Sequence, residues 1–123
     1  MVATLPGTAG AIFQFYCRIF YDTATAADIK FAFTIPAGAA MRWGLSSLGT
    51  GGTNPTYTTT NVSGTALAAG GLGVGATLYA SIEGEVTMGA TPGNLQLQAA
   101  QNTSDPSVTT FFSRSYMEVW RTA

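Results

Sequence analysis

Two glutamates two residues apart are the strongest candidates for acid–base chemistry in this sequence. Glu83 and Glu85 lie in an alternating segment, so both side chains would project from one face of a strand, about 7 Å apart. Glycoside hydrolases use carboxylates at comparable separations, one as an acid and the other as a base or nucleophile. The alternative is that both glutamates simply solvate the outer face of an amphipathic strand. We favour this alternative, because one short strand reveals no substrate cleft.

The other reactive residue types are scarce. The chain has no histidine, which removes the usual general base and a common zinc ligand. Cys17 is its single cysteine and alternates with Phe15 and Ile19, so we expect a buried, unreactive thiol and no intramolecular disulfide. Asp22 and Asp28 bracket a loop, but calcium needs six or more oxygen ligands, and we expect turn-forming aspartates instead. We therefore predict no enzyme activity, no metal site and no cofactor.

Charge is the most unusual feature of the composition. Charged residues make up 9% of the 123 residues, against about 25% in an average soluble protein. With a net charge of −1, the protein would gain little from the release of counterions on binding nucleic acid, and it has no polybasic patch to bind anionic lipid. We expect neither a nucleic acid nor a membrane as partner. A surface with so few charges instead suits a protein that is packed among other proteins.

The hydrophobic pattern has period two almost throughout, which predicts an all-β protein. We expect one domain over residues 1–123, an antiparallel β-sandwich or jelly roll of seven or eight strands, with residues 1–10 as an extended amino-terminal segment. The first two strands, 11–21 and 29–35, are predicted to form a hairpin. Segment 46–75 is predicted to contain one short strand, and the last two strands are expected at 107–112 and 116–121. The predicted core is Phe13, Phe15, Ile19, Phe31, Phe33, Trp43, Leu78, Ile82, Val86, Leu95, Leu97 and Val119.

Several large side chains fall on strand faces opposite this core. They could stack against sugars, bury against another subunit or cap the ends of the sandwich. We favour protein contact, because little charge lies nearby to bind a polar ligand and because tyrosine and tryptophan are enriched at the centres of interfaces. The candidate interface residues are Tyr16, Arg18, Tyr57, Tyr79, Tyr116 and Trp120.

Two longer motifs resemble a family of small virion proteins of tailed bacteriophages. The first is FYCRIFYDTATAADIKFAFTIP at 15–36, followed by GAAMRWG at 38–44. The second is IEG at 82–84 followed by GATPGNLQLQ at 89–98, AQNTS at 100–104 and a closing strand near 116–120. The likeness covers most of the chain from about residue 11 onward.

The resemblance implies a structural component of a phage particle. One role is a capsid decoration, or cement, protein that forms a homotrimer over capsomer contacts and binds the major capsid protein. The other is a tail-fibre or tail-tip β-domain that binds a receptor or glycan. We favour decoration, because the chain has the length of an independent domain, a near-neutral surface rich in threonine and alanine, and no long fibre-forming segment.

Overall fold

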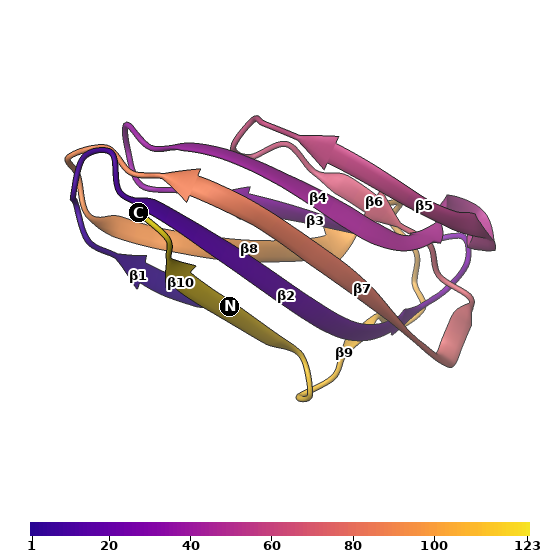
Figure 1. Ribbon diagram of the computed structural model, residues 1–123. Coiled ribbons are helices and arrows are strands. Elements are labelled where there is room, and N and C mark those ends of the chain that lie inside the picture. Colours follow the sequence, from indigo (N-terminus) through magenta and orange to yellow (C-terminus); the bar gives the residue numbers. More distant parts are fainter.

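Two antiparallel β-sheets packed face to face form the protein, as the computed structural model, which describes residues 1–123, shows (Figure 1). A three-residue 3₁₀ turn, Thr50–Gly52, interrupts an otherwise all-β chain. The strands are β1 (Val2–Leu5), β2 (Ile12–Thr23), β3 (Ile29–Thr34), β4 (Ala40–Gly49), β5 (Thr53–Thr60), β6 (Leu67–Ala69), β7 (Gly73–Thr87), β8 (Gly93–Gln101), β9 (Thr110–Phe111) and β10 (Tyr116–Arg121). No helix has the length and apolar character needed to cross a membrane.

The strand order is that of a jelly roll. One sheet has the order β1-β8-β3-β6, and the other contains β2-β7-β4-β5 in the same succession. Strands that are consecutive in the chain mostly alternate between the two sheets, which is how two interlocked Greek keys wind into a jelly roll. Strands β10 and β9 both pair with β2 and widen the second sheet to six strands. The predicted fold class is therefore confirmed, with ten strands in place of seven or eight.

The predicted hairpin between the first two strands is wrong. β2 and β3 belong to opposite sheets, and β2 pairs with β7 whereas β3 pairs with β8 and β6. The chain changes sheets at Asp28, whose φ of 49° is in the left-handed region that aspartate tolerates better than most residues. A polar loop between two amphipathic strands fits either connection. The structure has the crossing, in which the apolar faces of β2 and β3 pack against each other across the core, as in the ring contacts of Phe15 with Phe33 and of Tyr21 with Phe31.

The strands missing from the sequence prediction have weak patterns. Segment 46–75 contains all of β5 and β6, two strands where one is predicted, and β6 includes part of the alanine tract at 66–69. β5 is exposed over nearly its whole length, so its residues do not alternate between apolar and polar. The amino-terminal segment contains β1, which pairs with β8 from Val2↔Gln96 to Leu5↔Gly93. The strand predicted at 107–112 shrinks to two residues, whereas β10 matches its predicted bounds.

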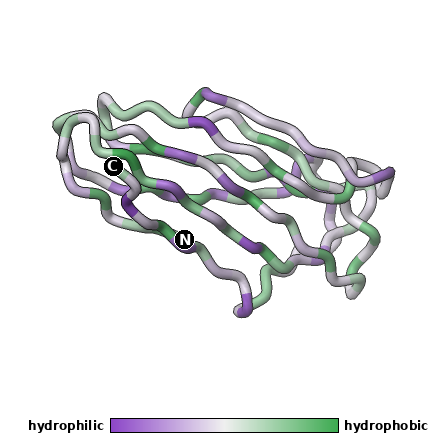
Figure 2. The backbone as a smooth tube through the Cα atoms, viewed as in Figure 1, coloured by the Kyte–Doolittle hydropathy of each residue, from purple (hydrophilic) through white to green (hydrophobic).

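The core lies between the sheets and is rich in aromatic residues. Phe33 packs against Phe15 and Trp43, with ring centroids 4.9 and 5.0 Å apart. Ten of the twelve predicted core residues are buried, and the other two, Leu78 and Val119, are partly buried and pack against them. Polar and apolar residues alternate along the strands (Figure 2). The period-two hydrophobic pattern of the sequence therefore predicted the core correctly.

Candidate functional site

The outer face of the six-stranded sheet brings together most of the predicted interface residues. The register places Tyr116 of β10 beside Arg18 of β2, and Tyr79 of β7 beside Phe20 of β2. Tyr16 lies two residues from Arg18 on the same face of β2. We call these five side chains the aromatic patch: Tyr16, Arg18, Phe20, Tyr79 and Tyr116.

Arg18 lies at the centre of the aromatic patch. Its guanidinium carbon is 5.9 Å from the ring centroid of Tyr16 and 5.2 Å from that of Tyr79, within the range of cation–π attraction. One guanidinium nitrogen donates a hydrogen bond to the Tyr16 hydroxyl at 3.0 Å, and that hydroxyl is 3.3 Å from the Ser81 hydroxyl. The bond to Tyr16 raises the pKa of Arg18 above its ordinary value. Arg18 therefore remains charged and is held in one orientation.

The aromatic rings of the patch contact each other in pairs and remain accessible. The rings of Tyr16 and Tyr116 are 6.1 Å apart, and those of Phe20 and Tyr79 are 5.8 Å apart. Tyr79 is 56% exposed and Tyr116 is 40% exposed. Arg114 extends the patch, because its guanidinium carbon lies 5.9 Å from the ring of Phe20. The resulting surface is mainly aromatic, carries the charges of two arginines and is open to a partner.

Phe20 and Arg114 are members of this surface that the sequence analysis missed. The alternation of β2 already places Phe20 on the face of Tyr16 and Arg18, so continuing the pattern two residues further would have found it. Arg114 lies in the turn before β10, where no periodic pattern applies.

Two predicted interface residues lie on the same sheet but outside the patch. Trp120 of β10 pairs with Gln14 and is 44% exposed at the edge of the sheet. Tyr57 of β5 pairs with Ser46 on the far side of β4 and is 60% exposed. The six predicted residues therefore share one sheet face but do not form one cluster.

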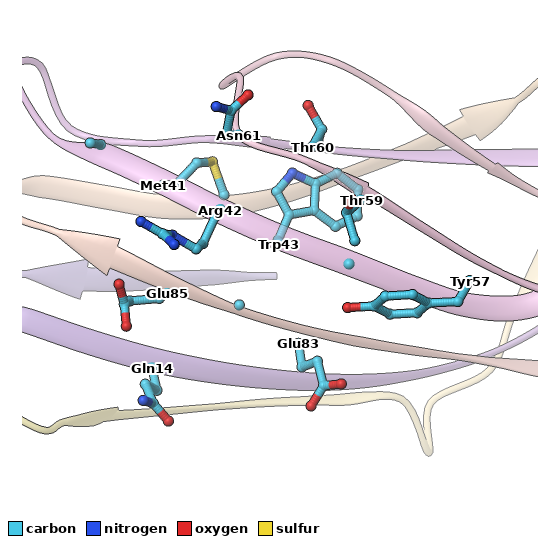
Figure 3. Close-up of a pocket in the computed structure, with 13 residues that line it drawn as sticks. Gln14, Met41, Arg42, Trp43, Tyr57, Thr59, Thr60, Asn61, Glu83 and Glu85 are labelled. Atoms are coloured by element: carbon cyan, nitrogen blue, oxygen red, sulfur yellow. The ribbon is translucent and has the colours of Figure 1, made fainter.

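A hollow of about 890 Å³ lies on the same face, and Figure 3 shows the side chains that line it. It adjoins the aromatic patch, because its lining residue Glu83 lies opposite Tyr16 in the register of β2 and β7. Glu83 and Glu85 both line it, which confirms that they project from one face of a strand. Glu83 is exposed and Glu85 is half-buried. The hollow supplies the concavity that the sequence could not reveal, and its remaining side chains include Gln14, Arg42, Tyr57, Thr59 and Asn61.

The two aspartates predicted to form turns are buried. Asp22 lies inside β2, with Oδ1 buried and without a hydrogen-bond partner. The Asp28 carboxylate accepts hydrogen bonds from the Gly51 N–H at 2.9 and 3.0 Å and from the Gly71 N–H at 3.0 Å. It thereby ties two glycine-rich loops to the start of β3. No group of three or more histidine, cysteine, aspartate or glutamate side chains could hold a metal ion.

Two further titratable groups lie in the core and do not belong to a reactive site. Cys17 is fully buried, and this burial raises its pKa to about 12, so the nucleophilic thiolate is suppressed at neutral pH. The Tyr21 hydroxyl donates a hydrogen bond to the Gly70 carbonyl oxygen at 2.7 Å. Burial and the negative charge of Asp28 raise the pKa of Tyr21 to about 12.

Comparison with known proteins gives no relative from which a role could be transferred. No family model, no curated protein and no solved structure matches the chain.

Proposed function

We propose that this chain is a non-enzymatic structural protein of a bacteriophage particle, acting as a head decoration protein that binds the major capsid protein and neighbouring copies of itself. The observation that carries the proposal is the aromatic patch, an ordered surface of four rings around Arg18. Burying such a surface stabilises a contact by about 25 cal/mol per Å² of apolar area, before the costs of association. The symmetry of a capsid repeats this contact many times, so that contacts that are weak individually add up to a stable attachment.

The other sheet offers no comparable surface. The outward residues of β8 are Asn94, Gln96, Gln98 and Ala100, and those of β3 are Lys30, Ala32 and Thr34. Tyrosine and arginine are favoured at interface centres, whereas lysine and alanine are depleted there. This asymmetry favours attachment through the six-stranded sheet. Jelly rolls are used by viral capsid and lectin domains, so the architecture is compatible with a virion role but does not require one.

Self-association provides the first test. We expect sedimentation velocity to detect oligomers, with a trimer as the proposed species, and Tyr79→Glu to dissociate them by placing a charge in the aromatic patch. Gln98→Glu adds the same charge to the outer face of the other sheet and serves as the matched control. A monomer at all concentrations, or equal effects of the two variants, would contradict the proposed interface.

Copy number separates decoration from the alternative, a tail-fibre or tail-tip domain with a receptor-binding role. A decoration protein is present in hundreds of copies per particle, and gel densitometry of purified virions would count them. A handful of copies would refute decoration and favour the tail. Absence of the protein from purified particles would refute both virion roles.

A further inference from the structure

One outward position of the sheet beneath the hollow has no side chain. Gly44 occupies this position on β4, between Thr59 of β5 and Glu83 of β7 in the register of the strands. A larger residue here would collide with the Tyr57 side chain, which lies above the glycine. The position of Tyr57 in the hollow therefore depends on a glycine in the middle of a strand, where glycine is otherwise unfavourable.

Tyr57 lies across this glycine. Its ring reaches diagonally from the position opposite Ser46, and a Cβ placed on Gly44 would come within 2.8 Å of the ring carbon Cε2. The hydroxyl-bearing end of the ring thus lies directly over the backbone of β4, yet the side chain remains 60% exposed. Its hydroxyl extends along β4 into the hollow (Figure 3). The result is an aromatic platform with one supported side and one open side.

Hydrogen-bond donors and acceptors line the rest of the hollow. Glu85 of β7 lies between Gln14 of β2 and Arg42 of β4 in the register, and Glu83 lies opposite Gly44. Asn61 completes the rim beyond the end of β5. Carboxylates only accept hydrogen bonds, guanidinium only donates them and side-chain amides do both. The hollow therefore presents acceptors and donors next to an apolar ring.

This combination points to a neutral, polyhydroxylated ligand, and we propose that the hollow binds a saccharide. The open side of the Tyr57 ring would pack against the carbon-bearing face of a sugar ring. Glu83 and Glu85 would accept hydrogen bonds from sugar hydroxyl groups, and Arg42 would donate to them, which are charge-assisted bonds of about twice the usual strength. A cationic ligand would meet Arg42, and an anionic ligand would meet both glutamates. The site would add glycan binding to the particle whether the protein decorates the head or belongs to the tail.

Saccharide binding can be tested on the intact protein with a pair of exposed aromatic residues, one inside the hollow and one outside it. A panel of neutral mono- and oligosaccharides would be screened by saturation-transfer NMR, and binders would be titrated calorimetrically. We expect Tyr57→Ala and the Glu83→Gln, Glu85→Gln double variant each to weaken binding at least tenfold. Phe111→Ala removes an aromatic side chain that is 45% exposed on β9, outside both the hollow and the aromatic patch, and we expect it to bind as the unchanged protein does.

Two outcomes would overturn the proposal. One is a panel without any binder. The other is binding that survives Tyr57→Ala, provided that this variant keeps the native circular dichroism spectrum. Oligolysine would be titrated as the competing cationic probe, and tighter binding of oligolysine than of every saccharide would also refute the assignment. None of these readouts depends on oligomer formation, so this inference and the proposed structural role can fail independently.

Discussion

Removing the Asp28 carboxylate should destabilise the fold more than its position beside a surface loop suggests. Hydrogen bonds to a charged group contribute about 1.5 to 3 kcal/mol each, and Asp28→Ala would remove the carboxylate that accepts from two backbone N–H groups, those of Gly51 and Gly71. Alanine at a φ of 49° adds about 1 kcal/mol of backbone strain. We therefore expect the free energy of unfolding to fall by about 4 kcal/mol, a large part of the about 5 to 15 kcal/mol typical of a domain.

Urea denaturation at pH 7, followed by tryptophan fluorescence, would measure this loss, because Trp43 is buried in the core. Asp28→Asn is the matched control. Its side-chain oxygen can replace Oδ1, which accepts from both Gly51 and Gly71, and asparagine also tolerates a positive φ. We expect a loss of about 1 to 2 kcal/mol for this variant. A loss below about 1 kcal/mol for Asp28→Ala, or equal losses for both variants, would refute the proposed role of the carboxylate.

Three further predictions concern the core and the hollow. The free energy of unfolding should fall as the pH rises from about 9 to 12, because Cys17 and Tyr21 keep their protons to about pH 12 in the folded protein but lose them near pH 9 and 10 in the unfolded chain. Each group should contribute a loss of up to about 1.4 kcal/mol per pH unit, and Cys17→Ala and Tyr21→Phe should each make the melting temperature depend less on pH. The Cys17 thiol should not react with a thiol reagent at pH 8 until urea unfolds the protein, and rapid native reaction would contradict its burial. No reducing sugar should be released from an oligosaccharide panel, whereas release abolished by Glu83→Gln, Glu85→Gln would establish an enzyme.

The fold class and the core could be predicted because both depend on residue alternation. A strand with one buried face must show period two, so the inward residues of β2, β3 and β7 were recognisable from sequence. The direction of each connection was not recognisable, because turn residues such as Pro36 and Gly38 suit a hairpin and a crossing between sheets equally well. Only burial of both sheets against each other decides between them.

The candidate site was partly predictable for the same reason. Alternation placed Tyr16 and Arg18 on one face of β2, and it placed Glu83 and Glu85 on one face of β7. The hollow was not predictable, because it depends on β5, which has no apolar alternation, and on the absence of a side chain at Gly44. A glycine within a strand indicates that another group approaches the backbone closely, but the sequence does not show which group it is.

Gly44 and Gly84 offer a direct comparison of the two faces of the same sheet. Gly84 points into the core, where an added Cβ would lie 2.6 Å from both the Arg42 carbonyl oxygen and the Cβ of Trp43 and would also overlap the Phe15 ring. These groups are fixed by the sheet and by core packing, so we expect Gly84→Ala to lower the free energy of unfolding by about 1 to 3 kcal/mol. The atoms nearest to Gly44 belong to the exposed Tyr57 ring, which can swing away.

Gly44→Ala should therefore cost less than about 1 kcal/mol, while displacing the platform and weakening saccharide binding as strongly as Tyr57→Ala does. Urea denaturation and calorimetric titration of the same two variants would separate these effects. Equal destabilisation by both substitutions would mean that Tyr57 is held as rigidly as the core. A stable Gly44→Ala protein with unchanged affinity would mean that the position of the ring over β4 has no part in binding. The comparison thus tests whether the missing side chain at Gly44 serves the hollow or only the packing of the sheet.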